Sequence, residues 1–283
     1  MRSHDTDCDW EHFGRTEPYW AVSTKEQFRR ENLDSRSLAE FFAGGGKHVD
    51  WVLEVVRRRV DAGFVPRMAL DFGCGVGRLT LPLARKCESV VGVDVSEGML
   101  REARAQAEAQ GLTNVRFVRG DDDLSAVEAG YDFMISHIVF QHIPCDRGQR
   151  LLQRLVDLLA DGGVGAVHLT YSKRVFDAEL FDAWPAAAPA YSGRPLTELR
   201  KSWSAWVRVL RRRFRKRRTK GGGTNDVPMQ MNPYTLNPLL HLLQRAGVRR
   251  MHVEFTDHGG DYGLVLFFRK SADETYFAWP TPV

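Results

Sequence analysis

The chain has 283 residues with a formal net charge of +4 at pH 7, and 43% of the residues are hydrophobic. This length can bury a sizeable core and favours one α/β domain with additions over two equal domains. No apolar run approaches the ~20 residues that span a bilayer, and the acidic, polar N-terminal residues show no basic-then-apolar signal pattern. The four cysteines show no metal or redox spacing, so the expected compartment is the reducing cytoplasm.

Residues 1–66 are expected to form a helical segment ahead of the core. Aromatic side chains gather in HFGRTEPYW, and an apolar period through Val49, Val52 and Val56 predicts a helix. The aromatic cluster either closes over a ligand as a lid, with Trp20 as its contact, or fastens the first helix to the sheet.

The sequence ALDFGCGVG, residues 69–77, places Asp71 at the end of an apolar strand, two residues before Gly73. A strand that receives a phosphorylated nucleotide presents glycines and a helix N-terminus to the phosphates, which a carboxylate would repel. Arg78 stands where a dinucleotide-binding pattern has its third glycine. This arrangement favours a cationic nucleotide cofactor, and S-adenosylmethionine has an ammonium, a sulfonium and no phosphate.

Three further strands are expected after a helix at about 77–85. The second strand, residues 89–96, ends at Asp94, where a carboxylate can accept hydrogen bonds from both ribose hydroxyls. A helix at about 97–110 and the strand VRFVRG lead to Asp121, whose carboxylate can accept a hydrogen bond from an adenine amino group. The fourth strand lies in YDFMISHIVFQHIP and precedes a polar turn with histidines.

In these four segments, and over roughly residues 67–270, the chain resembles the class I S-adenosylmethionine-dependent methyltransferases. The sequences ALDFGCGVG, VVGVDVS, FVRGDD and residues 136–142 are similar to the first four motifs of that family, in the right order. The resemblance implies a Rossmann-like α/β fold with a seven-stranded, mostly parallel sheet, an antiparallel C-terminal hairpin, an N-terminal helical segment and an inserted helical cap. It also implies S-adenosylmethionine as cofactor and S-adenosylhomocysteine as product.

The resemblance assigns the cofactor to residues at the strand ends. Asp121 and Asp122 would frame the adenine, on which Val95 and Met99 would pack, while Cys74 is a small residue that fills the glycine turn. The full predicted set is Asp71, Gly73, Cys74, Gly75, Asp94, Val95, Met99, Asp121, Asp122, Ser136 and His137. Trp20 and Tyr171 are predicted contacts of the lid or substrate.

A hydroxyl acceptor loses its proton as the new bond forms, so a histidine with a pKa near 6.5 is a suitable general base. His142, in FQHIP, follows the fourth strand where the methyl group should point, and many hydroxyl-directed members of the family carry a histidine there. The alternative role for His142 is a hydrogen bond to a loop.

Some quinone-ring O-methyltransferases of this fold hold a divalent metal in the same turn through acids and a histidine. Here the corresponding residues are His137, Gln141 and His142, so no metal site is predicted. A divalent metal stays an open alternative, with oxygens from Asp122, Asp123 or Asp261.

Residues 173–232 are expected to be an inserted cap between the core at 67–172 and a C-terminal unit at 233–270. Between positions 194 and 220 the chain has twelve Lys or Arg and one acid. The apolar face of the predicted helix comprises Leu199, Trp203, Trp206, Leu210 and Phe214. Three interpretations of residues 198–220 follow: the helix lies on an anionic membrane surface, it binds an anionic substrate, or it only covers the core. Nucleic acid is not favoured as the substrate.

The C-terminal unit is expected to be a helix closed by Gly247 and two strands around the turn HGGDYG, followed by a tail at 271–283. Together these features predict an S-adenosylmethionine-dependent methyltransferase that acts on oxygen, with a sugar or glycan hydroxyl as the favoured acceptor. The alternatives are O- or N-methylation of a small aromatic or polyketide metabolite, and a cofactor-binding subunit without catalysis. The expected location is the cytoplasm, including the inner membrane surface.

Overall fold

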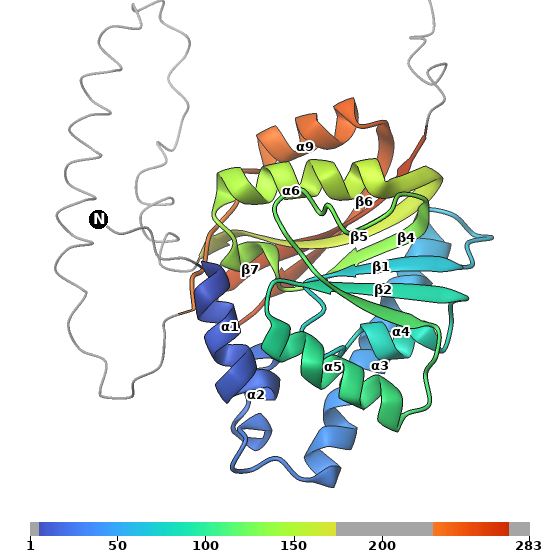
Figure 1. Ribbon diagram of the computed structural model, residues 1–283. Helices are drawn as coiled ribbons and strands as arrows, with labels where there is room; N and C mark the ends of the chain where they lie inside the picture. Colours follow the sequence, from blue (N-terminus) through green and yellow to red (C-terminus); the bar gives the residue numbers. More distant parts are fainter. Residues whose placement is uncertain (1–5, 174–228, 272–283) are drawn as a thin grey trace, which may run out of the picture. The chain divides into compact units, whose positions relative to one another are not determined.

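A computed structural model describes residues 6–173 and 229–271 of the chain (Figure 1). Four helical elements precede the sheet: α1 (Thr6–Thr16), α2 (Pro18–Val22), the 3-10 turn η1 (Glu26–Phe28) and α3 (Ser35–Arg59). Helix α3 begins with a reciprocal cap, because the Ser37 amide donates to the Asp34 carboxylate at 2.7 Å and the Asp34 amide donates to Ser37 Oγ at 2.9 Å. Its buried face contains the predicted valines at positions 49, 52 and 56.

Seven strands form one sheet in the order β3-β2-β1-β4-β5-β7-β6. Their bounds are β1 (Met68–Phe72), β2 (Ser89–Asp94), β3 (Val115–Arg119), β4 (Tyr131–Ser136), β5 (Leu159–Lys173), β6 (Val248–Asp257) and β7 (Asp261–Lys270). All neighbouring pairs from β3 to β5 are parallel, while β7 is antiparallel to both β5 and β6. The predicted mostly parallel sheet with a C-terminal hairpin is confirmed.

Helices cover both faces of the sheet (Figure 1). Helices α3, α4 (Thr80–Ala84) and α5 (Glu97–Ala109) lie on one face, and α6 (Cys145–Leu158) and α9 (Leu236–Arg245) lie on the other. Helix α4 is shorter than the predicted helix at 77–85, because Gly77 has a positive φ of 83° and the residues before Thr80 form turns. The predicted breaks at Gly111 and Gly247 follow α5 and α9, each with positive φ.

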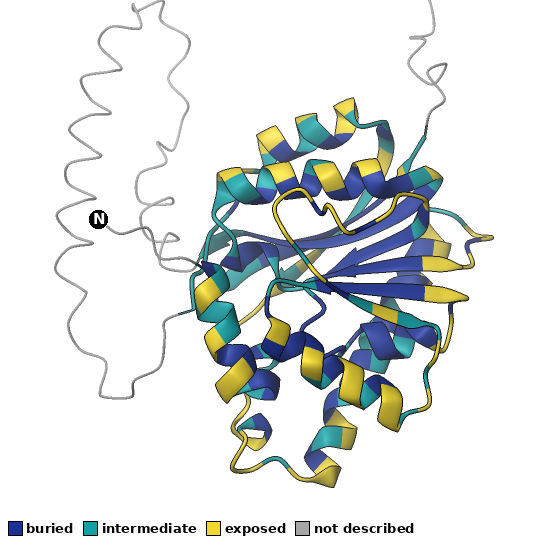
Figure 2. Ribbon diagram, in the orientation of Figure 1, coloured by how far each residue is buried: buried dark blue, intermediate teal, exposed yellow. Residues whose placement is uncertain are grey.

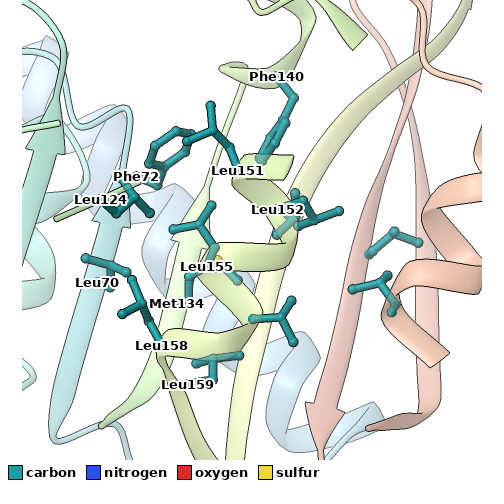
Figure 3. Packing of buried hydrophobic residues seen from close by; sticks show 14 of the residues in the cluster. Leu70, Phe72, Leu124, Met134, Phe140, Leu151, Leu152, Leu155, Leu158 and Leu159 are labelled. Carbon is teal, nitrogen blue, oxygen red and sulfur yellow. The ribbon is translucent and has the colours of Figure 1, made fainter. Parts of the chain in front are cut away.

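Two apolar clusters hold these layers together. Side chains of α6 and α9 pack on one face of β1, β2 and β4, and side chains of α3 and α4 pack on the other. Figure 3 shows Leu151, Leu152 and Leu155 of α6 against Leu70 and Met134 of the strands. The central strands β1, β2 and β4 are therefore buried on both faces, and exposed residues gather on the outer sides of the helices (Figure 2). This packing fixes the strand ends that form the site.

The strand order reverses between β1 and β4. From β1 the chain proceeds outward through β2 and β3 and then returns to place β4 on the other side of β1. In open α/β sheets a ligand crevice lies outside the carboxyl ends of the strands at such a point. The glycine-rich turn follows β1 at this position.

Candidate functional site

A pocket lies at the carboxyl ends of β1, β2 and β4. The predicted residues that line it are Asp71, Gly73, Cys74, Gly75, Asp94, Val95, Met99, Asp121, His137 and His142. The predicted residues that do not line it are Asp122, Ser136, Trp20 and Tyr171. The pocket thus brings together side chains from four strand ends.

The turn after β1 needs its glycines. Gly73 has a φ of 74°, and a Cβ at this position would overlap the side chain of Val139 beyond β4. Asp71, just before the turn, is 2% exposed and accepts a hydrogen bond from Thr80 Oγ1 at 2.6 Å. Burial, with a contribution from Asp94, raises the pKa of Asp71 to about 7. A carboxylate in this state is stabilised by a cationic ligand.

Asp94 ties the end of β2 to the same turn. Its Oδ2 accepts the Gly75 amide at 2.9 Å, and its Oδ1 accepts the Ser96 amide at 2.9 Å. Burial raises the pKa of Asp94 to about 6, although these backbone hydrogen bonds oppose the shift. The turn amide is therefore held by a carboxylate, which leaves the glycine loop poorly suited to phosphate.

The two acids after β3 differ in their surroundings. Asp121 lines the pocket, but its carboxylate accepts hydrogen bonds from the amides of Asp123 and Ser125 and from Ser125 Oγ. Asp122 instead accepts a hydrogen bond from Arg147 Nε at 2.6 Å. Sequence analysis placed both acids around the adenine, whereas in the structure Asp122 holds Arg147 at the rim.

Helix α1 roofs the pocket. Thr6, Asp7 and Trp10 line it, and the Asp7 carboxylate accepts two hydrogen bonds from Arg147, at 2.6 and 2.8 Å. Glu11 accepts hydrogen bonds from Ser96 Oγ at 2.9 Å and from the Gly98 amide at 3.1 Å, so it contributes to capping α5. These contacts fix helix α1 over the pocket.

Of Trp10 and Trp20 in the N-terminal segment, Trp10 lines the pocket and Trp20 does not. Trp20 lies outside the pocket lining, where Arg29 stacks 4.1 Å from its ring and Phe13 lies 6.3 Å away. Trp10 lines the pocket instead, and its ring lies 5.0 Å from the ring of His142. Tyr171, the other predicted contact, packs on the core and lies 6.3 Å from the Phe255 ring. The rings of Trp10 and Trp20 both lie near Phe13, at 5.7 and 6.3 Å, and the role of Trp20 as a lid contact stays a prediction.

His142 lies in the 3-10 turn η2 (Phe140–His142) after β4 and is 6% exposed. Its Nδ1 is 2.7 Å from the backbone carbonyl oxygen of Gln230, and a carbonyl only accepts, so Nδ1 carries the proton. Burial lowers the pKa of His142, which keeps the ring neutral at pH 7. Nε2 then carries the lone pair and accepts a long hydrogen bond from Gln141 Nε2 at 3.4 Å. This tautomer is the one that a general base requires.

The segment between β4 and η2 holds backbone strain at the pocket wall. Ile138 has a φ of 58°, which is unusual for a β-branched residue and costs ~1–3 kcal/mol. Its neighbour His137 also lines the pocket, whereas Ser136 is 1% exposed and lies behind the wall. Strain of this kind occurs where the surrounding structure fixes side chains for function.

Sequence analysis assigned no role to Arg78 or Arg147, which both line the pocket. A signal for Arg78 was present, since it interrupts the dinucleotide glycine pattern. Among residues 6–173 and 229–271, no group of three or more His, Cys, Asp or Glu is arranged to hold a metal ion, and no helix is long and apolar enough to cross a membrane. The predicted basic helix at 198–220 lies outside the described residues.

Comparisons with known proteins agree with this geometry. A family model described as a methyltransferase domain matches residues 69–163. Aklanonic acid methyltransferase DauC of Streptomyces sp. (strain C5) is 30% identical over 170 residues, which cover 58% of this chain and 74% of that protein. Trans-aconitate 2-methyltransferase of Methylobacterium radiotolerans is 38% identical over 106 residues, which cover 37% of this chain and 38% of that protein.

The chain therefore belongs to the class I S-adenosylmethionine-dependent methyltransferases, and the predicted family is confirmed. The crystal structure of magnesium protoporphyrin IX methyltransferase ChlM from Synechocystis PCC 6803, with bound S-adenosylhomocysteine, has the same fold. It aligns with a TM-score of 0.57 and 19% identity over 94% of this chain and 100% of that one. Against several other curated relatives the chain spans only 2% to 38% of their length.

Proposed function

We propose that this protein transfers a methyl group from S-adenosylmethionine to a hydroxyl oxygen of its acceptor. The observation that carries the proposal is one pocket with two carboxylates at the glycine turn, Asp71 and Asp94, and a neutral histidine, His142, on the opposite strand end. The proposed cofactor site consists of the residues predicted above at the ends of β1, β2 and β3, and the sequence prediction adds Ser136 and His137 at the end of β4.

The carboxylates support a cationic cofactor. A buried carboxylate with a raised pKa gains free energy when a positive charge approaches, and it loses free energy beside a phosphate. Asp71 and Asp94 both have raised pKa values, to about 7 and about 6. The ammonium and sulfonium of S-adenosylmethionine match this charge, while the phosphates of a dinucleotide do not.

The reaction itself needs alignment and the removal of one proton. The acceptor oxygen attacks the methyl carbon as the bond from that carbon to sulfur breaks, and sulfur leaves as a neutral thioether. Holding the two reactants in line supplies much of the rate. In the proposed reaction His142 Nε2 exchanges its hydrogen bond from Gln141 Nε2 for the acceptor hydroxyl and takes up the hydroxyl proton, while the Gln230 carbonyl holds Nδ1–H. Trp10 and α1 cover this region and exclude water.

For the acceptor we propose a sugar or glycan hydroxyl, with a hydroxyl or amine of a small aromatic or polyketide metabolite as the alternative. The relatives DauC and trans-aconitate 2-methyltransferase are named for organic acids, which favours testing acidic acceptors as well. Peripheral contact with an anionic membrane through residues 198–220 stays a proposal from the sequence. Sedimentation with anionic liposomes tests it, and loss of binding when Arg211 to Arg218 are neutralised is the expected result.

The decisive experiment combines calorimetry with a transfer assay. We expect S-adenosylmethionine and S-adenosylhomocysteine to bind and NAD not to bind, and the reverse result would overturn the proposal. Labelled cofactor is then offered with sugars, glycolipids, phenols and carboxylic acids. A methyl ether survives mild alkali whereas a methyl ester is hydrolysed, so alkali treatment of the product distinguishes hydroxyl from carboxyl transfer.

The variant His142→Ala tests the base. It should bind S-adenosylhomocysteine normally and lower turnover by ~100- to 10,000-fold, while His241→Ala, on the exposed side of α9, should match the wild type. An unchanged rate would remove His142 from the mechanism. Cofactor binding without transfer to any acceptor would favour the alternative of a non-catalytic subunit.

A further inference from the structure

Four histidines from distant parts of the chain meet beside the pocket. His48 lies on α3, His137 follows β4, His168 lies in β5 and His258 lies in the turn between β6 and β7. The ring centroids are 3.8 Å apart for His48 and His137, 5.3 Å for His137 and His168, and 5.0 Å for His168 and His258. This histidine cluster runs from the pocket wall at His137 to the exposed turn at His258.

The imidazoles of the cluster are uncharged at pH 7, because burial lowers the pKa values of His48, His137 and His168, and the positive charge beside them is that of Arg78. Burial has the largest effect on the pKa values of His48 and His137, and Arg78, which also lines the pocket, and the neighbouring imidazoles lower these values further. The acids of the adjacent turn are engaged elsewhere or act on another ring: Asp257 accepts the Gly260 amide at 2.6 Å, and Asp261 acts on the pKa of His142. An anion is the ligand that this concentration of donors would stabilise.

Two buried donors or acceptors of this region have no partner in the described part of the chain. His168 is 1% exposed, and its Nε2 contacts Thr256 Oγ1 at 3.0 Å while Nδ1 contacts nothing polar. Arg78 Nε is buried and unpaired, and its guanidinium lies 5.5 Å from the Phe41 ring. Buried polar groups without partners are costly, so their presence next to a pocket indicates a ligand that pairs with them.

We propose that the acceptor carries a carboxylate, and that Arg78 and His137, backed by the histidine cluster, bind it while another oxygen of the acceptor is methylated. This inference rests on the proposed methyl transfer and names the chemical class of its acceptor. The acidic group is an anchor and undergoes no reaction. A guanidinium matches a planar carboxylate through two parallel hydrogen bonds, and a doubly charged phosphate would be disfavoured by Asp71 and Asp94 in the same pocket.

The sheet order places this anchor on the acceptor side. The acids assigned to the cofactor follow β1, β2 and β3, on one side of the point where the strand order reverses. The histidine cluster extends to the other side of that point, from β4 through β5 to the β6–β7 turn. A carboxylate held there lies away from the ribose and adenine ends of the cofactor. The other source of a carboxylate is the methionine part of the cofactor itself, and the experiment below separates the two.

The test uses the full chain saturated with S-adenosylhomocysteine, so that the carboxylate of the cofactor already occupies its own place. Binding of 4-hydroxybenzoate and D-glucuronate is compared by calorimetry with binding of 4-hydroxybenzamide and D-glucose. We expect each acid to bind at least about tenfold more tightly than its neutral partner. No saturable binding of either acid at tens of millimolar, or equal affinities within each pair, would overturn the proposal.

Variants then locate the anchor. Arg78→Met and His137→Gln should each abolish the preference for the acid, and Arg78→Met should change the affinity for S-adenosylhomocysteine less than about threefold. The matched controls Arg36→Met and His241→Gln replace exposed residues outside the pocket and should behave as the wild type. If the pocket variants instead lose S-adenosylhomocysteine affinity and keep the preference, the residues hold the cofactor and the acceptor anchor is wrong.

Two readouts keep the conclusions separate. Failure of the wild type to bind S-adenosylhomocysteine would contradict the proposed function, whereas normal cofactor binding without an acid preference would contradict only the anchor. The acid and amide comparison on the wild type needs no variant, so it decides the question even where Arg78→Met fails to fold.

Discussion

Replacement of Asp71 by asparagine should stabilise the cofactor-free protein and weaken cofactor binding. The pKa of this buried carboxyl is raised from 3.8 to about 7, so its ionised form is unfavourable in the native state by up to ~4 kcal/mol. Asparagine removes that charge, and its side-chain oxygen can still accept the hydrogen bond from Thr80. We expect the free energy of unfolding at pH 8 to rise by roughly 1–3 kcal/mol, since water penetration reduces the upper limit.

The effect of Asp71 on stability depends on pH, because the pKa of its carboxyl differs between the unfolded and native states. The native state of the wild type binds more protons than the unfolded state between pH 3.8 and about 7, so Asp71 lowers the stability progressively as the pH rises through this window. The advantage of Asp71→Asn should therefore be absent near pH 3.8 or below and complete above pH 7. Urea unfolding at a series of pH values measures it.

Calorimetry with S-adenosylmethionine provides the second half of the test. Loss of the charge opposite a cationic ligand should lower the affinity at least ~tenfold at pH 8. Asp123→Asn, which removes an exposed acid after β3, is the matched control and should change neither quantity. A variant that is less stable than the wild type at pH 8 and binds the cofactor equally well would refute this electrostatic account of the site.

Two further predictions concern the roof and the histidine cluster. Arg147→Met removes the hydrogen bonds to Asp7 on α1 and should speed S-adenosylhomocysteine dissociation ~tenfold in stopped-flow measurements. The control Arg150→Met, on the exposed side of α6, should leave the dissociation rate unchanged. Equal dissociation rates for Arg147→Met and the wild type would show that α1 does not limit release. Burial, Arg78 and His258 lower the pKa of His48 to about 4. As the pH falls from 6.5 to 4, the free energy of unfolding of the wild type should therefore decrease by up to ~1.4 kcal/mol per pH unit more than that of His48→Gln. Parallel curves of stability against pH for the two proteins would contradict this prediction.

The sequence was sufficient to predict the sheet because strand ends and local turns carry their own signals. Apolar runs that stop at Asp71 and Asp94, with glycines after the first, specify where two strands end and what lies beyond them. Parallel strands present these ends at one edge, so the acids had to come together. Asp122 shows where this reasoning stops, because its partner Arg147 is 25 residues away and gives no local pattern.

Contacts between distant segments could not be predicted in this way. Hydrophobic period predicts that α3 has a buried face, but not that His48 on it meets His168 of β5 and His137 after β4. Which tryptophan lines the pocket could not be predicted for the same reason. Trp10 and Trp20 stand in one aromatic cluster, and only the packing of α1 on α5 decides which faces the pocket. There Gly14 approaches Ser96 so closely that a Cβ would overlap the serine hydroxyl.

The segment that returns from the insertion shows how such distant contacts reach the chemistry. The Asn232 amide donates to the Gln141 carbonyl at 2.6 Å and the Tyr234 amide donates to the Thr170 carbonyl at 2.8 Å, so this segment is fixed to η2 and β5. Those bonds hold the Gln230 carbonyl against His142 Nδ1, and that contact selects the tautomer of the ring. The basicity of His142 Nε2 thus depends on a backbone atom 88 residues away, and a histidine motif alone cannot specify it.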